Sequence, residues 1–258
     1  MANQKISELT SLTGSGAAQD DLLPIVDVST STTKKITREE FFKSVDYIGF
    51  DMTNVVAAPT EGQLTWDATD KTLSLGLNGG NVVLQIGQEM YYRVKNTTGS
   101  TILNGTVCRF AGSQGNSGIL LAAPFQANGT YNSNVIMGIA TEDIPNGSEG
   151  LVTSFGKVRG VNTSAFTDGQ ILYASPSVAG GLTSTKPDAP NNVVSVAAVV
   201  SASNNGVLFV RPHVEDIWQN VPATSTSPGS KGDNAFDANY FYVCVATNTW
   251  KRVALSTW

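Results

Sequence analysis

The sequence predicts a mainly β protein, made of antiparallel β-sandwich or fibre-type modules with a short α-containing N-terminal segment and a small C-terminal β module. Three observations predict this class. Charged residues make up 14% of the 258 residues, against about 25% in an average soluble protein. Gly, Ser, Thr and Asn take their place, and these residues favour turns over helix. Short apolar and alternating runs, each bounded by Gly, Asn or Pro, follow one another from Gly62 onward.

These runs give the predicted strands, because alternation of apolar and polar residues is typical of a half-buried strand. They are Gln63–Trp66, Thr72–Leu77, Asn81–Gly87, Met90–Asn96, Thr106–Ala111, Ile119–Ala123, Val135–Thr141, Gly150–Phe155, Lys157–Val161, Ile171–Ala174, Val193–Val200, Val207–Val210 and Tyr240–Ala246. Five Asn-Gly pairs separate them. Asn and Gly tolerate the positive φ of tight turns, so each pair is a predicted turn.

The N-terminal residues have a different pattern. KISELTSL predicts a short helix, and LLPIVDV (Leu22–Val28) predicts a brief strand. In TREEFF, Thr37 and Glu40 form a capping box, which predicts a helix from about Thr37 to Val45. A helix this short is not stable alone and must pack on its own chain or on a neighbour.

Composition divides the chain into five predicted parts. They are an N-terminal segment (1–45), a β-hairpin connector (46–88), a main β domain (89–216), a linker (217–234) and a small C-terminal β module (235–258). The linker assignment follows from the Pro, Gly and Ser of VPATSTSPGSKGDN. The last module predicts a hairpin that turns at Thr247–Thr249. A lone hairpin is marginal in water, so we expect it to associate with other copies.

Composition also excludes several classes of function. The net charge is −5 and no basic stripe is visible, so no nucleic-acid partner is predicted. No apolar run approaches the ~20 residues of a membrane span, so no membrane insertion is predicted. MANQKISELTSL lacks the pattern of a signal peptide. Cys108 and Cys244 each lie in an apolar run, which predicts buried free thiols.

Few residues offer chemistry. The single histidine, His213, argues against a catalytic triad or a multi-histidine metal site. We consider the acidic pairs Asp20-Asp21, Glu39-Glu40 and Glu142-Asp143 as acid/base carboxylates, but adjacent residues of a strand point to opposite faces. The loop with Asp233, Asn234 and Asp237 lacks the calcium-loop pattern, so a plain turn is favoured. No phosphate or dinucleotide motif occurs, and no metal or other cofactor is predicted.

Aromatic residues gather near the C-terminus. Exposed aromatic rings stack on sugars, and so Tyr240, Tyr242, Trp250 and Trp258 are candidates for sugar stacking. The favoured alternative is that alternate residues of Tyr240–Val245 form the buried face of a strand, with Trp250 paired across the hairpin.

Three stretches resemble proteins of the virions of tailed bacteriophages, of the kind common in phages of marine bacteria and cyanobacteria. The first, KISELTSLTGSGAAQDDLLPIVDVSTSTTKKITREEFF, resembles the attachment segment that begins many phage fibre and neck-appendage proteins. The second begins GQLTWDATDKTLSLGLNGG and is similar to a module of phage tail-fibre proteins. The third, GDNAFDANYFYVCVATNTWKRVALSTW, resembles a short terminal module of phage structural proteins.

The resemblance implies a short homotrimeric tail fibre or fibre adaptor, made in the host cytoplasm and located in the virion as a tail appendage. Its N-terminus would dock on tail or baseplate proteins, and its distal part would reach towards host-surface polysaccharide or another fibre protein. The apolar residues expected to anchor the docking segment are Ile6, Leu9, Leu12, Leu22, Leu23, Ile25, Val26, Phe41 and Phe42. They could instead build a small N-terminal core.

Two other functions remain open. One is a capsid decoration protein or head fibre, which would use the same docking segment on a different surface. The remote one is a polysaccharide depolymerase, for which carboxylates would have to converge in a groove. No sequence motif supports such an enzyme, and the sequence therefore predicts a non-enzymatic virion component involved in host attachment.

Overall fold

The computed structural model of the protein describes residues 22–27, 32–37, 47–50, 59–78, 82–188, 191–216 and 221–258. The chain divides into two compact units, Met1–Asp51 and Met52–Trp258. In the described ranges the regular structure is almost entirely β, with a 3₁₀ turn, η4 (Ser133–Val135), and a 3₁₀ residue at Asn78. The predicted mainly β class is confirmed.

In the first unit, β1 (Leu22–Asp27) and β2 (Thr32–Thr37) form an antiparallel pair. The predicted strand Leu22–Val28 is therefore confirmed. Thr37, the predicted N-cap of a helix, is the last residue of β2 and pairs with Leu22, which is compatible with an N-cap because the backbone of an N-cap residue is extended. The β-branched residues of TTKKIT favour a strand over a helical turn. The rest of that helix, and the one predicted in KISELTSL, lie outside the described residues.

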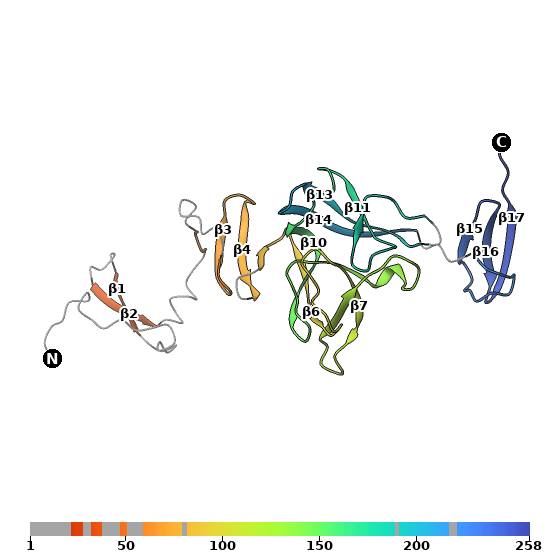
Figure 1. Ribbon diagram of the computed structural model, residues 1–258. Helices are drawn as coiled ribbons and strands as arrows, with labels where there is room; N and C mark the ends of the chain where they lie inside the picture. Colours follow the sequence, from red (N-terminus) through yellow and green to blue (C-terminus); the bar gives the residue numbers. More distant parts are fainter. Residues whose placement is uncertain are drawn as a thin grey trace. The chain divides into compact units, whose positions relative to one another are not determined.

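The second unit begins with a three-stranded antiparallel sheet, β3 (Leu64–Asp67), β4 (Thr72–Leu77) and β5 (Val82–Gln85). The strands follow one another as a meander, with Leu75 opposite both Leu64 and Leu84. This sheet is drawn in orange in Figure 1. It covers the stretch in which the sequence predicts three alternating strands.

Nine strands form the largest sheet, in the order β12-β11-β13-β14-β10-β6-β8-β7-β9. They are β6 (Met90–Asn96), β7 (Val107–Ser113), β8 (Leu120–Pro124), β9 (Ile136–Ala140), β10 (Glu149–Val161), β11 (Ile171–Ala174), β12 (Leu182–Thr183), β13 (Val193–Ser201) and β14 (Gly206–Asp216). The β6–β8 pair is parallel, and the other pairs are antiparallel.

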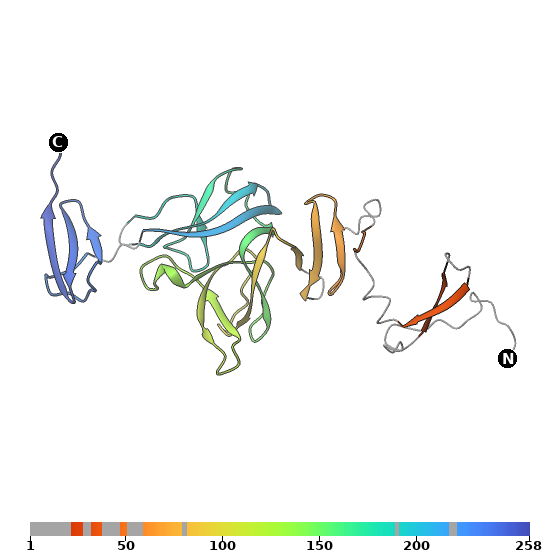
Figure 2. The same cartoon turned by 180° about the vertical axis from the view of Figure 1, so that it is seen from behind.

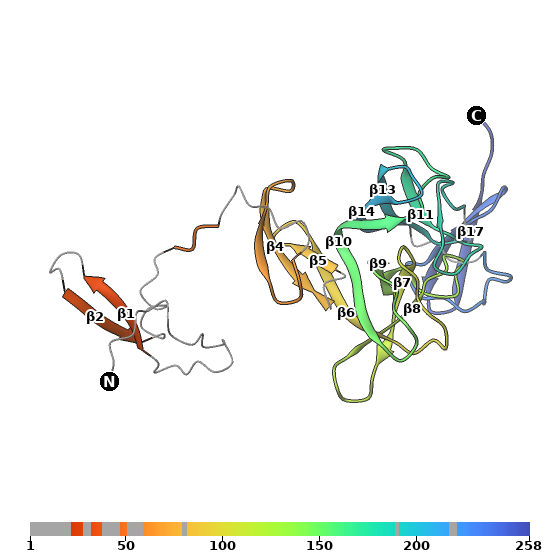
Figure 3. The ribbon, with the colours of Figure 1, turned by 60° about the vertical axis from the view of Figure 1, so that its left-hand side comes forward.

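One end of this sheet closes on itself, because β9 pairs with β10 as well as with β7. The strands β10, β6, β8, β7 and β9 thus form a ring, and Figure 3 shows them together. The sheet continues from β10 to β14, which pairs with the second half of β10, and then to β13, β11 and β12. These strands form the upper layer in Figure 1. β10 therefore belongs to both parts.

The long strand β10 joins two predicted strands, Gly150–Phe155 and Lys157–Val161. Its residues before Gly156 pair with β6, and those from Gly156 onward pair with β14. Gly156 has φ of +121°, which only glycine adopts readily. Gly156, which separates the two predicted strands, therefore lies at a bend within one continuous strand.

Two apolar clusters make the core of this region. The first lies inside the ring and includes Val94, Ile102, Cys108, Ile144 and Val152. The second packs β10, β11, β13 and β14 against the ring, and its members include Phe125, Ile139, Leu172, Val194 and Leu208. Both cysteines are buried free thiols, as predicted, and burial raises the pKa of Cys108 to about 12. No helix in the described part of the chain is long and apolar enough to cross a membrane.

The C-terminal sheet has the order β15 (Asn234–Phe236), β16 (Tyr240–Ala246) and β17 (Thr249–Ala254), and Figure 2 shows it from behind in blue. The hairpin turn at Thr247–Thr249 is confirmed, with Asn248 at φ of +52°. The chain before β15 lies against β17, because the Trp250 amide donates to Ser225 O (2.8 Å) and its indole donates to Ser227 O (3.1 Å).

Closure of the ring depends on Gly138 in β9. Its φ is +147°, and a Cβ atom at this position would lie 1.9 Å from the Thr153 carbonyl oxygen of β10. We expect Gly138→Ala to push β9 from β10 and to lower the free energy of unfolding by about 3 kcal/mol or more. Thermal and urea unfolding measure this.

The matched control is Gly49→Ala, where a Cβ atom meets nothing within 4 Å. This variant should change the free energy of unfolding by less than about 1 kcal/mol. An unchanged stability of Gly138→Ala would contradict the closed ring.

Candidate functional site

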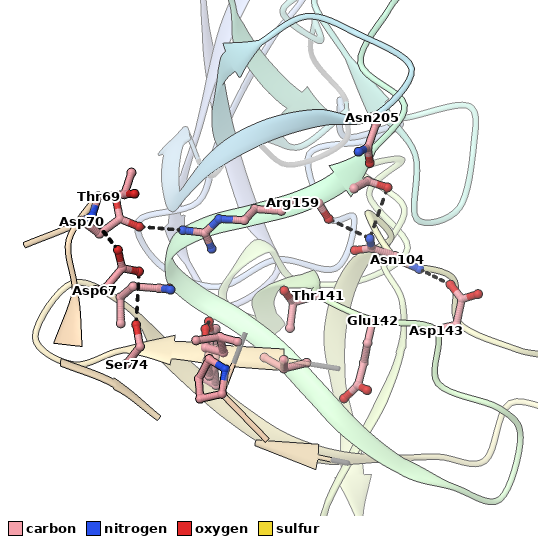
Figure 4. Close-up of a pocket in the computed structure, with 16 residues that line it drawn as sticks. Asp67, Thr69, Asp70, Ser74, Asn104, Thr141, Glu142, Asp143, Arg159 and Asn205 are labelled. Atoms are coloured by element: carbon pink, nitrogen blue, oxygen red, sulfur yellow. Dashed lines mark hydrogen bonds and ion pairs between the residues drawn. The ribbon is translucent and has the colours of Figure 1, made fainter. Parts of the chain in front are cut away.

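A cavity of about 1000 Å³ is lined by residues of the β3–β5 sheet and of the nine-stranded sheet. Figure 4 shows Asp67 and Asp70 on one side of it and Glu142 and Asp143 on the other, with Arg159 between them. The lining residues are mostly polar, and they are Pro59, Asp67, Thr69, Asp70, Ser74, Val82, Val83, Gln85, Tyr91, Asn104, Thr141, Glu142, Asp143, Arg159, Gly160 and Asn205. The structure thus brings together carboxylates that are far apart in the sequence.

Asp67 organises the turn between β3 and β4. Its Oδ1 accepts hydrogen bonds from the Thr69 amide (2.8 Å) and the Asp70 amide (3.0 Å), and its Oδ2 accepts from the Ser74 hydroxyl (3.3 Å). These hydrogen bonds, the one from Asp70 first, lower the pKa of Asp67. Asp67 is therefore a charged residue that holds the turn and presents Asp70 at the cavity.

Asp70 takes part in an ion-pair network with β10. Its carboxylate pairs with the Lys157 ammonium and, at 3.2 Å, with the Arg159 guanidinium. Arg159 also donates to Glu89 Oε1 at 3.0 Å. The network joins the β3–β4 turn to the strand that runs through both parts of the large sheet.

Glu89 is the buried member of this network, only 5% exposed. Its oxygens also accept from the Gln85 amide (3.3 Å), the Lys157 amide (3.2 Å) and the Tyr91 hydroxyl (2.5 Å). Such donors are needed because an unpaired buried carboxylate is strongly unfavourable. Burial, and then the hydrogen bond to Glu89, raise the pKa of Tyr91, so its hydroxyl stays protonated.

The opposite side of the cavity is built around a pair of buried isoleucines. Ile102 and Ile144 form an antiparallel bridge, with hydrogen bonds of 3.0 and 2.7 Å between their backbones. The bridge places Asn104 beside Asp143. The Asp143 Oδ1 atom accepts a hydrogen bond from the backbone N–H of Asn104 at 2.8 Å. The Asn104 side chain donates to Arg159 O (2.8 Å), and its own Oδ1 is buried without a partner among the described residues.

Glu142 lies in the same loop. Its Oε2 accepts from Asn78 Nδ2 (2.5 Å) and its Oε1 accepts from the Leu151 amide (3.0 Å). Burial nevertheless raises the pKa of Glu142, since desolvation outweighs these hydrogen bonds. The pKa values of Asp67 and Glu142 are therefore shifted in opposite directions.

The sequence argument against paired action of Glu142 and Asp143 starts from a wrong premise. It places them on opposite faces of a strand, but β9 ends at Ala140 and both residues lie in the bend that follows. Both line the cavity. The acidic pairs Asp20-Asp21 and Glu39-Glu40 lie outside the described residues.

Other sequence candidates lie elsewhere. His213 is exposed on β14, opposite Ser195, and does not line this cavity. The Asp237 carboxylate accepts from the amides of Asn239 and Tyr240 and from the Tyr242 hydroxyl, so it stabilises a turn. Asp233 accepts from the Ser230 amide, and Asn234 donates to Gly232 O. Within the described ranges, no group of three or more His, Cys, Asp or Glu could hold a metal ion.

Two of the four sugar-stacking candidates are buried in the core of the C-terminal sheet. Tyr242 is 7% exposed and Trp250 is 5% exposed, and both pack with Ala235 and Cys244. Their ring faces are therefore not available to a sugar, because alternate residues of β16 face this core. Tyr240 lies partly buried under the Arg252 guanidinium (4.0 Å), and Trp258 is fully exposed.

The docking candidates fall in the first unit. Leu22, Leu23, Ile25 and Val26 belong to β1. Ile6, Leu9, Leu12, Phe41 and Phe42 lie outside the described residues. Docking by these residues stays a prediction.

Sequence reasoning missed Asp67, Asp70, Glu89, Asn104 and Arg159 as members of a site. Asn104 carried a signal, since the Asn-Gly turn that it begins was predicted. The others could not be grouped, because only the pairing of β10 with β6 places Arg159 beside Glu89. The resulting arrangement offers carboxylates, amides and hydroxyls to a polar ligand, and burial raises the pKa of one of these carboxyl groups, Glu142.

Comparison with known proteins gives two partial similarities. The chain is 51% identical over 57 residues to "Depolymerase 1, capsule K30/K69-specific" of Klebsiella phage K5-2. It is 43% identical over 58 residues to "Depolymerase, capsule K30/K69-specific" of Klebsiella phage K64-1. Each match covers 22% of this chain and 7% of the relative, so the chain spans a small part of their length. No family model matches the chain.

These similarities change two expectations. The prediction of a non-enzymatic virion component is contradicted, because both relatives are named as capsule depolymerases, a function that the sequence leaves open only as a remote alternative. The marine or cyanobacterial type of phage has no support, since both relatives come from Klebsiella phages. The resemblance to tail-associated phage proteins is supported in its general form.

The network around Glu89 predicts a large loss of stability on neutralisation. Glu89→Gln keeps the side-chain volume but removes the charge that Arg159 and the Tyr91 hydroxyl contact. We expect the free energy of unfolding to fall by about 2–4 kcal/mol, measured by urea denaturation.

The matched control is Glu149→Gln, which removes a more exposed partner of Arg93 at the start of β10. Its cost should stay below about 1 kcal/mol. Equal costs for the two variants would show that the Glu89 network does not hold the β3–β5 sheet to the large sheet.

Proposed function

We propose that this chain is part of a phage tail appendage that acts on the capsular polysaccharide of the host. The observation that carries this proposal is the similarity to two capsule depolymerases. The matched segment covers 22% of this chain, and we carry the activity of the relatives over to it as a hypothesis. The cavity lined by Glu142 and Asp143 is where the polysaccharide would bind.

The chemistry of the cavity suits a carbohydrate. Its lining offers carboxylates, side-chain amides, hydroxyls and one tyrosine, which match the alternating donors and acceptors of sugar hydroxyls. Its volume of about 1000 Å³ lies at the upper end of the range of ligand pockets. A stretch of several sugar units therefore fits better than a single one.

Glu142 is the proposed general acid. Cleavage of a glycosidic bond needs one carboxyl group to protonate the leaving oxygen and a second carboxylate to activate water or to attack the sugar. Burial raises the pKa of Glu142, which is the direction that a general acid needs. Asp143 is the proposed second carboxylate, because only one of its oxygens is used by the Asn104 amide.

The assembly we propose is a homotrimer that docks through its first 45 residues on tail or baseplate proteins. Physical support comes from the C-terminal sheet. Its buried core has only four residues, while Val253 on the other face is 60% exposed. Such a small unit gains stability from association with other copies.

The cleavage test uses the full chain and purified capsular polysaccharide of types K30 and K69. We expect new reducing ends and a shortened polymer, and a loss of about 10²–10⁴-fold in rate for Glu142→Gln. Glu149→Gln, a nearby glutamate that does not line the cavity, should keep the wild-type rate. A full rate for Glu142→Gln would contradict its role as the acid.

The same assay has a predicted pH dependence. Because the pKa of Glu142 lies above its ordinary value of 4.5, the protonated form persists to higher pH than in a free glutamate. The rate should fall as the pH rises through this pKa. A rate that does not fall on the alkaline side would argue against Glu142.

The assembly is tested by light scattering of the full chain and of a variant lacking residues 1–45. We expect a trimer in both cases, since the proposed contacts lie outside the N-terminal segment. A monomer in both cases would contradict the fibre and would favour a capsid-bound protein that assembles only on its lattice.

A further inference from the structure

We propose that the Asn104 end of the cavity selects a sugar unit that carries no acidic group. The Asn104 end consists of Asn104, Asp143, Gly160 and Asn205. Figure 4 labels Asn104, Asp143 and Asn205 on the same side of the cavity. The inference rests on the proposed function, because it names the sugar class that this same cavity takes.

The first argument is charge. Beside the proposed acid Glu142, three carboxylates line the cavity, those of Asp67, Asp70 and Asp143, against the guanidinium of Arg159. That guanidinium is already paired with Asp70 at 3.2 Å and with Glu89 at 3.0 Å. No cation of the lining is left to neutralise a ligand carboxylate, and a bound uronate would meet like charges.

The second argument is the hydrogen-bonding capacity of Asn104. Its Nδ2 donates to Arg159 O at 2.8 Å and points towards Gly160 O at 3.4 Å. These contacts fix the orientation of the amide, so the buried atom without a partner is the acceptor Oδ1. The N–H groups of Asn104 are therefore used within the protein, and none is left for the carboxylate of an acidic sugar.

Asp143 and Asn205 extend the same pattern. Asp143 Oδ1 accepts from the Asn104 amide, which leaves the other carboxylate oxygen for a second ligand donor. The Asn205 side chain is exposed at the cavity, where its amide can donate to a ring or glycosidic oxygen. A hydroxyl group of a neutral sugar can donate to the free carboxylate oxygen of Asp143. The carboxylate of an acidic sugar would instead place its own acceptor oxygens against that oxygen.

The test compares matched tetrasaccharides that differ only in the oxidation of C6: galactose with galacturonate, glucose with glucuronate, and mannose with mannuronate. Binding to the full chain is measured by calorimetry and by saturation-transfer NMR. In the series that binds, the neutral member should bind at least about tenfold more tightly at low salt. The difference should shrink as the ionic strength rises, because salt screens charge repulsion.

Two variants sharpen the comparison. Asp143→Asn keeps an acceptor for the backbone N–H of Asn104 but removes the negative charge. The affinity for the acidic tetrasaccharide of each pair should therefore rise relative to that for the neutral tetrasaccharide. Asn205→Ala should weaken the neutral member several-fold. Asp188→Asn, an exposed residue outside the cavity lining, is the control and should change neither.

Equal or tighter binding of the acidic members would overturn the inference. Cleavage of the capsule without binding of any neutral member would also overturn it and leave the proposed function standing. Selective binding of a neutral member without cleavage would support the inference and count against the proposed cleavage.

Discussion

The buried carboxylate of Glu89 is the group on which the architecture of the cavity depends. Its oxygens accept from two backbone amides, the Tyr91 hydroxyl and the Arg159 guanidinium. The backbone of β10 has to pass very close, and a Cβ atom at Gly156 would lie 2.5 Å from the Glu89 side chain. The positive φ of Gly156 and its lack of a side chain allow this approach, and Arg159, further along β10, reaches the same carboxylate. Arg159 in turn holds Asp70, and with it the β3–β4 turn.

Much of the fold follows from local sequence patterns. Alternation between Gly62 and Asn96 predicted β3 to β6, with Thr72–Leu77 and Met90–Asn96 at the observed bounds. Asn-Gly pairs marked turns because glycine accepts positive φ, as Gly105 and Gly147 do. The pairing of β9 with β10, and the parallel pairing of β6 with β8, could not be predicted, since they join segments without a shared local signal.

The candidate site was harder to predict than the fold, because its residues come from segments that share no local sequence signal. Glu89 and Arg159 are 70 residues apart in the sequence and meet only in the folded sheet. The failure at Glu142 and Asp143 came from extending a strand beyond Ala140 into the bend that follows. The helix predicted after Thr37 stays a prediction, since its residues lie outside the described part of the chain, and Thr37 itself ends β2 opposite Leu22. The prediction of a non-enzymatic protein rested on the absence of a motif, and such an absence does not exclude carboxylates that come together only in the fold.

The course of β10 has a consequence for synthesis of the protein. This strand pairs with β6, β9 and β14, and so it is shared by the closed ring and by the strands that continue from it. Until Val161 has left the ribosome, β6 and β9 have no partner on that side, and their edges are open to other chains. Nascent chains on one messenger RNA therefore carry the open edge of β6 while residues 97–161 are made, about a quarter of the chain, and crowding of ribosomes favours pairing between copies.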